Sequence, residues 1–93
     1  MSGTSRSSDG LDERRRRLLF RAWHRGMREV DLITGRFADA YIGSLTEAEV
    51  DEFEGLMDVP EPELLAWVMG AEPTPAQFDT VLFRKMRDFR GAA

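Results

Sequence analysis

Apolar residues in this chain recur every three or four positions, in short runs that end near a glycine or a proline. In the first run, Leu19, Ala22 and Trp23 share this spacing, which places their side chains on one face of a helix. No stretch alternates between apolar and polar residues for long enough to predict a strand. The pattern therefore predicts an all-α protein built from short amphipathic helices.

Signals at the ends of these runs divide the chain into five helices. Thr46 and Glu49 form a capping box, in which each residue satisfies a free backbone amide of the other. Pro62 suits the first position of a helix, and Thr74 followed by Pro75 predicts the start of the last one. The five helices are expected at residues 11–24, 28–42, 47–57, 63–69 and 75–90. Connections this short predict a compact five-helix bundle in a single domain.

The apolar face of each helix predicts which side chains are buried. In the second helix these are Val30, Ile33, Phe37, Ala40 and Tyr41. In the last helix they are Phe78, Val81, Leu82, Met86 and Phe89. Gly35 interrupts the second helix and lowers its stability by about 1 kcal/mol relative to alanine, and nothing in the pattern explains its presence.

The length and the two ends of the chain indicate how it is organised. Ninety-three residues suffice for one domain, and residues 1–10 are polar and lack the apolar core of a secretory signal. We expect a disordered tail over residues 1–10, the helical bundle over residues 11–90 and a frayed C-terminus at residues 91–93. No apolar run approaches the roughly 18 residues needed to span a bilayer. These features predict a cytoplasmic protein without membrane insertion, with the mitochondrial matrix as the less favoured location.

The available side chains argue against catalysis and metal binding. There is no cysteine, which excludes a disulfide, a thiol nucleophile and a thiolate metal site. His24 is the single histidine of the sequence, and no spacing around it suggests a catalytic triad or a metal cluster. The carboxylates of the third helix are typical of a solvated face rather than of an acid–base pair. We therefore expect no catalytic residues, no bound metal ion and no enzymatic activity.

Charge is divided along the chain. Residues 1–36 carry nine arginines and five acidic residues, and residues 37–83 carry eleven acidic residues and no basic one. Such asymmetry orients a docking partner more than it determines the fold. The arginine run at residues 14–17 could contact phosphates, but the pI of about 5.0 is far below the value above about 9 that is typical of a nucleic-acid domain. We expect this run to pair with nearby acids, and we expect no nucleic-acid partner.

Gly26 breaks the first apolar face and predicts a corner between the first two helices. On spacing alone, an Arg25–Glu29 ion pair at i, i+4 and a capping glycine account for this segment. An exposed pair of that kind contributes only ~0.3–0.5 kcal/mol. Trp23 is assigned to the core, and the alternative is that Trp23 or Met27 supplies an apolar anchor for a partner.

The segment Trp23–Asp31 resembles the signature of the small FAD assembly factors of succinate dehydrogenase, whose hallmark is Arg-Gly-x-x-Glu. The similarity extends over about residues 12–90. It includes the Arg/Leu-rich segment before the motif, the segment Leu64-Leu65-Ala66-Trp67, Pro73 and Phe78. The order of these features in so short a chain makes the resemblance specific.

This resemblance implies a five-helix bundle with no cofactor of its own. It implies that the chain binds the flavoprotein subunit of succinate dehydrogenase, or of the related bacterial fumarate reductase, and promotes covalent attachment of FAD to a histidine of that client. The motif match assigns partner binding to Arg25, Gly26 and Glu29, and Arg28 and Asp31 are added because they lie beside them. We expect these residues at an outward-facing corner of a protein that is monomeric when free. The alternatives are a helical adaptor or regulator with another client and a small nucleic-acid binder.

Overall fold

A computed structural model of the protein describes residues 10–89. Within that range the chain forms five α-helices and one 3-10 helix, and it contains no strand. The elements are α1 (Glu13–Trp23), α2 (Arg28–Tyr41), α3 (Glu47–Met57), α4 (Glu61–Met69), the 3-10 helix η1 (Ala76–Phe78) and α5 (Val81–Asp88). The prediction of an all-α, five-helix fold is confirmed. The tail expected at residues 1–10 lies outside the described residues except for Gly10, and so does the frayed end expected at residues 91–93.

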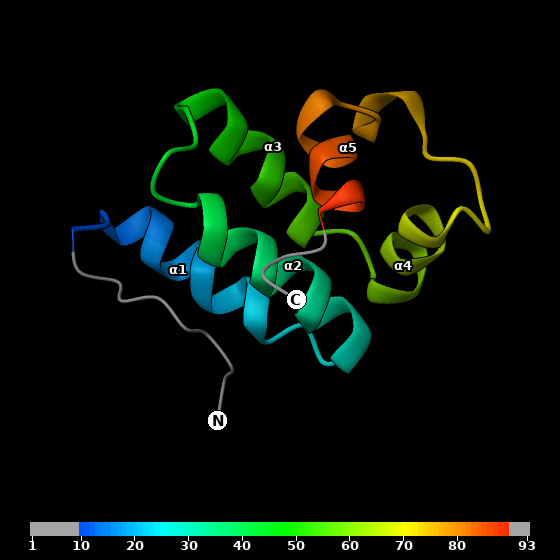
Figure 1. The fold of residues 1–93 in the computed structure, drawn as a ribbon, viewed down its shortest axis with the longest axis horizontal. Coiled ribbons are helices and arrows are strands. Elements are labelled where there is room, and N and C mark those ends of the chain that lie inside the picture. The colour runs from blue at the N-terminus through cyan, green and yellow to red at the C-terminus, as the bar shows by residue number, and fades with distance from the viewer. Residues whose placement is uncertain (1–9, 90–93) are drawn as a thin grey trace.

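The helices pack around one core. α1 and α2 lie side by side, α3 and α5 pack against this pair and against each other, and α4 packs against α2 (Figure 1). Phe37, Phe53 and Phe83 are fully buried in the same cluster and come from α2, α3 and α5. The ring centroids of Phe37 and Phe53 lie 5.6 Å apart in an edge-to-face arrangement, which is a favourable geometry for two aromatic rings.

Side-chain caps fix the starts of α1 and α3. A carboxylate oxygen of Asp12 accepts a hydrogen bond from the Arg15 backbone N–H at 2.8 Å. In α3, the Glu49 backbone N–H donates to Thr46 Oγ1 at 3.1 Å, and the Thr46 backbone N–H donates to Glu49 Oε1 at 2.9 Å. The predicted capping box is confirmed, and α3 has the predicted bounds because its start is encoded within four residues.

The start of the last helix was predicted wrongly. The pair Thr74–Pro75 precedes only the single 3-10 turn Ala76–Phe78, and α5 begins at Val81 with Thr80 as its N-cap. Thr80 Oγ1 accepts from the Phe83 backbone N–H at 3.1 Å, so this later cap satisfies the first turn. The new start changes which side chains are buried: Val81, predicted in the core, is 75% exposed, and Phe83 is buried instead.

Two smaller differences concern α4 and α2. α4 begins at Glu61, so Pro62 is the second helical residue and not the first. The carbonyl of Pro60 accepts from the Leu64 backbone N–H at 3.1 Å, which extends the helix by that turn. Ala40, predicted in the core, is exposed, because the buried face of α2 passes through Thr34, Phe37 and Ala38.

Packing against Trp23 explains Gly35. An added Cβ at Gly35 would lie 2.3 Å from Cδ2 of the Trp23 indole, so the ring of α1 lies directly on the backbone of α2. Trp23 Nε1 donates to Asp39 Oδ1 at 3.1 Å, which satisfies the polar edge of this buried ring. Trp23 therefore belongs to the core, as the simpler of the two interpretations predicts, and the missing side chain of Gly35 lets its ring pack on the backbone of α2.

The arginine run ties α1 to α3 and to the segment between α2 and α3. Arg14 donates from Nε and Nη2 to the two carboxylate oxygens of Glu54, at 2.9 and 2.7 Å. Arg15 donates from Nε to the Ile42 carbonyl at 3.1 Å and from Nη2 to the Leu45 carbonyl at 2.6 Å. The expected pairing of this run with acids is confirmed for Arg14, Arg15 and Arg17. Arg15 in addition satisfies backbone carbonyls in the loop that leads to α3.

These bonds predict a loss of stability in acid. The side-chain hydrogen bond from Arg14 holds the pKa of Glu54 below its usual range, and the backbone hydrogen bond from Arg15 lowers the pKa of Asp12. A carboxylate whose folded-state pKa is depressed stabilises the fold above its unfolded pKa, and that contribution is lost as the pH falls below about 4. We expect the urea midpoint, followed by circular dichroism, to fall between pH 6 and pH 3. Glu54→Gln should show a smaller fall, and an equal fall would show that the Arg14–Glu54 bonds do not contribute.

Candidate functional site

The corner between α1 and α2 is built on a glycine in the left-handed region. Gly26 has φ +100°, a value that residues with a Cβ rarely adopt. An added Cβ at this position would meet no other atom within 4 Å, so the backbone angle and not local crowding requires glycine. The Gly26 backbone is exposed, so an incoming partner can approach it without meeting a side chain.

Arg25 points into the protein. Its side chain is 4% exposed. Nη1 donates to the Met57 carbonyl, Nη2 donates to the Val59 carbonyl, and Nη2 pairs with Glu61 Oε2 at 3.2 Å. Burial lowers the pKa of Arg25, and Glu61 opposes that shift; an arginine remains charged in such a setting. The ion pair expected between Arg25 and Glu29 is wrong, because the fork of Arg25 is already used by the end of α3 and the start of α4.

Asp31 closes the corner from the other side. Its Oδ1 accepts from the Arg25 backbone N–H at 2.6 Å, and its side chain is half-buried. The main chain of Arg25 is thus held by α2 while its side chain is held by the segment Met57–Glu61. Three parts of the fold therefore meet at Arg25: the corner itself, α2 and the segment that joins α3 to α4.

The five residues predicted to bind a partner therefore divide into two groups. Gly26, Arg28 and Glu29 are exposed, and neither charged side chain forms an ion pair with any residue between 10 and 89. Arg25 and Asp31 hold this exposed group in place. The expectation of an outward-facing corner is met by Gly26, Arg28 and Glu29 but is wrong for the side chain of Arg25, which is buried.

Residues 16–90 match the family model described as flavinator of succinate dehydrogenase. The chain belongs to this family. It is 39% identical over 85 residues to the FAD assembly factor SdhE of Acetobacter pasteurianus, which covers 91% of this chain and 78% of the relative.

Eukaryotic relatives carry the name succinate dehydrogenase assembly factor 2, mitochondrial. The protein of Dictyostelium discoideum is 31% identical over 74 residues, which cover 80% of this chain and 52% of the relative. The protein of Scheffersomyces stipitis is 37% identical over 62 residues, which cover 67% of this chain and 42% of the relative. The chain thus spans about half the length of these eukaryotic relatives. No solved structure matches it.

Sequence analysis missed the segment behind the corner, which is the turn between α3 and α4. Arg21 Nη2 donates to the Met57 carbonyl at 3.2 Å and to Asp58 Oδ1 at 2.8 Å. Arg25 donates to the same carbonyl, so two arginines of the α1 end converge on the turn that follows α3. The acidic, proline-containing sequence of that turn was the available signal, but the acceptors are mainly carbonyls, which every residue has.

Neither a cluster of metal-ligating side chains nor a membrane-spanning helix occurs between residues 10 and 89. Between residues 10 and 89 there is no group of three or more His, Cys, Asp or Glu side chains placed to hold a metal ion. In the same range, no helix has the length and apolar character required to cross a bilayer.

Proposed function

We propose that this chain is an assembly factor that binds the flavoprotein subunit of succinate dehydrogenase and promotes covalent attachment of FAD to a histidine of that client. Membership of the flavinator family and the similarity to SdhE support this function. The observation that assigns this function to a site is the exposure of Gly26, Arg28 and Glu29. These residues lie at a corner that the buried Arg25 side chain holds through its hydrogen bonds to two backbone carbonyls.

The proposed mechanism is positioning and not catalysis by this chain. Flavin attachment requires that the client histidine and the isoalloxazine ring meet in a reactive geometry. A helper that binds only the client conformation with that geometry increases its population. A preformed corner suits this task, because rigid contact groups lose little freedom on binding.

Gly26, Arg28 and Glu29 have different roles in the proposed interface. Glu29 lies in the first turn of α2, where a carboxylate is favoured by the helix dipole and is presented to a client donor. Arg28 offers a planar fork to a client carboxylate or carbonyl. Gly26 leaves space for a backbone to approach.

Further parts of the proposal concern the setting of this reaction. The chain holds no FAD of its own and acts on the flavin bound by the client. The chain is a monomer when free, and it works in a bacterial cytoplasm. The flavoprotein subunit of fumarate reductase is a second client of the same chemical class. A helical adaptor for an unrelated client remains the alternative, and purified flavoprotein distinguishes the two.

Variants at the corner test the proposed site. Glu29→Ala and Gly26→Arg should each lower covalent flavin on a co-expressed client flavoprotein by roughly tenfold or more, as expected for central contacts of an interface. Covalent flavin is measured by fluorescence of the denatured client in a gel. Glu63→Ala, an exposed carboxylate of α4, is the matched control and should leave the signal unchanged.

The outcomes separate structure from binding. Gly26→Arg places a side chain at φ +100°, so its helicity must be checked by circular dichroism. Glu29→Ala changes an exposed residue and should fold normally. Normal flavin fluorescence from a folded Glu29→Ala and a folded Gly26→Arg would remove the corner from the proposed site.

A further inference from the structure

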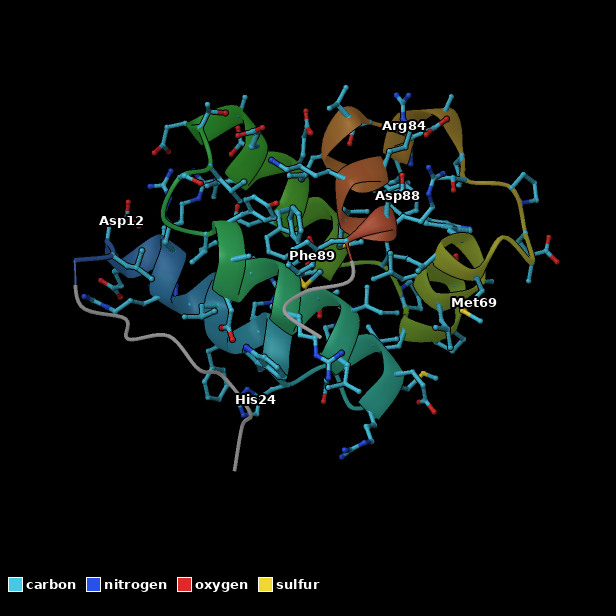
Figure 2. All side chains as sticks on the ribbon, viewed as in Figure 1. Asp12, His24, Met69, Arg84, Asp88 and Phe89 are labelled. Carbon is cyan, nitrogen blue, oxygen red and sulfur yellow. The ribbon has the colours of Figure 1, made fainter. Side chains whose placement is uncertain are left out.

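An aromatic platform lies on the outer face of α1. Phe20 is 63% exposed, and its ring stacks on the His24 ring with 3.9 Å between centroids and 15° between planes. His24 Nδ1 lies 2.7 Å from the Phe20 carbonyl oxygen, which fixes the orientation of the imidazole. Figure 2 shows His24 projecting from the end of α1 away from the other helices. One face of the Phe20 ring is thus covered by a neighbour on the same helix.

A groove of about 250 Å³ adjoins this platform. It is lined by Arg14, Arg17, Leu18, Phe20, Arg21 and Glu54. Its apolar lining comes from Leu18 and Phe20, and its charged groups are three arginines and one carboxylate. The carboxylate of Glu54 is already bound by two nitrogens of Arg14, so the cations that remain for a ligand are Arg17 and Arg21.

The present partners of Arg17 and Arg21 are weakly held. Arg17 pairs with Glu13 and Arg21 pairs with Asp58, and each carboxylate is 73% exposed. Exposed pairs of this kind contribute ~0.2–1 kcal/mol at most. A carboxylate from another protein can therefore replace either partner at little cost, and the adjacent apolar surface adds affinity that Glu13 and Asp58 do not provide.

The groove lies near the proposed corner. His24 directly precedes Arg25 and Gly26 in the chain. Arg21 on the groove and Arg25 at the corner both donate to the Met57 carbonyl. A partner that covers the corner with a surface of ordinary size, about 800 Å² on each side, extends over this part of α1.

We propose that the groove binds an acidic segment of the client flavoprotein, with an apolar side chain against Phe20 and a carboxylate between Arg17 and Arg21. This inference rests on the proposed function and adds a second contact region to it. The corner then orients the client, and the groove supplies an apolar anchor surrounded by charge, the usual arrangement of an interface centre.

The test measures the affinity of the chain for purified client flavoprotein by calorimetry. Phe20→Ala should weaken binding by roughly tenfold or more. Val81→Ala is the matched control, since Val81 is 75% exposed on α5, and it should bind as the unmodified chain does. Arg17→Gln should weaken binding at low salt and should reduce the loss of affinity between 50 mM and 200 mM salt, because screening acts on the removed charge.

The outcomes separate this inference from the proposed function. If Phe20→Ala and Arg17→Gln bind the client normally while Glu29→Ala binds weakly, the groove is not used and the proposed function stands. If the unmodified chain does not bind the flavoprotein at all, the proposed function and the groove both fail. If Phe20→Ala instead abolishes self-association in sedimentation experiments and leaves client affinity unchanged, the occupant is a second copy of the chain and the inference is overturned.

Discussion

Replacing Gly35 by alanine is expected to lower the free energy of unfolding by about 2 kcal/mol, or the thermal midpoint by roughly 10 °C. The new methyl group would lie 2.3 Å from Trp23 Cδ2, a distance at which the indole must move. Movement of the ring also disturbs the bond from Trp23 Nε1 to Asp39. The overpacking penalty exceeds the gain of about 1 kcal/mol that alanine normally brings to the interior of a helix.

Gly55 provides the matched control. It lies in the last turn of α3, and an added Cβ there would meet nothing within 4 Å. Gly55→Ala should therefore raise the free energy of unfolding by up to roughly 1 kcal/mol, and the thermal midpoint should rise with it. Trp23→Leu should destabilise the chain alone but should make the additional Gly35→Ala change much less costly. Equal effects of alanine at Gly35 and Gly55 would show that the close approach of α1 and α2 is not what requires glycine.

The second large effect is expected for Arg25→Met, which should cost about 2–3 kcal/mol of stability. The change removes the donors to the Met57 and Val59 carbonyls and leaves Glu61 without its cation. Glu61 keeps access to water, since a third of its side chain is exposed, and the penalty is therefore below that of a fully buried ion pair. Urea denaturation measures the loss.

A second measurement shows whether Arg25 acts on the corner itself. Amide hydrogen exchange at residues 24–28 should accelerate in Arg25→Met under native conditions, and client affinity should fall with it. Arg36→Met is the control, because Arg36 is exposed on α2 and its loss should change stability by less than about 0.5 kcal/mol. Weak client binding by Arg25→Met with unchanged exchange at the corner would instead assign Arg25 a direct contact with the client.

Elements with local signals could be predicted from the sequence, and elements with competing signals could not. The capping box of Thr46 and Glu49 lies within four residues, and α3 starts where it predicts. For the last helix, Thr74 was the predicted cap, whereas the structure uses Thr80. The later cap starts α5 and places Phe83 in the core beside other helices. Tertiary packing decided between two caps that are locally similar.

The candidate site was also predicted only in part from the sequence. The motif identified the correct segment, because Gly26 is needed for its backbone angle and Glu29 is exposed. The direction of the Arg25 side chain was missed, because its acceptors are carbonyls more than thirty residues further along the chain. Gly35 was unexplained for a similar reason, since the ring that requires it belongs to α1.

The shared Met57 carbonyl also limits how small a working mimic of this protein can be. A synthetic hairpin of α1 and α2 would contain every residue of the signature but neither the Met57 and Val59 carbonyls nor Glu61. The Arg25 side chain of this hairpin would be solvated, and the corner between its two helices would adopt many conformations. Grafting the motif onto another scaffold therefore requires transfer of the stretch that joins α3 to α4, although that stretch contributes nothing to the motif.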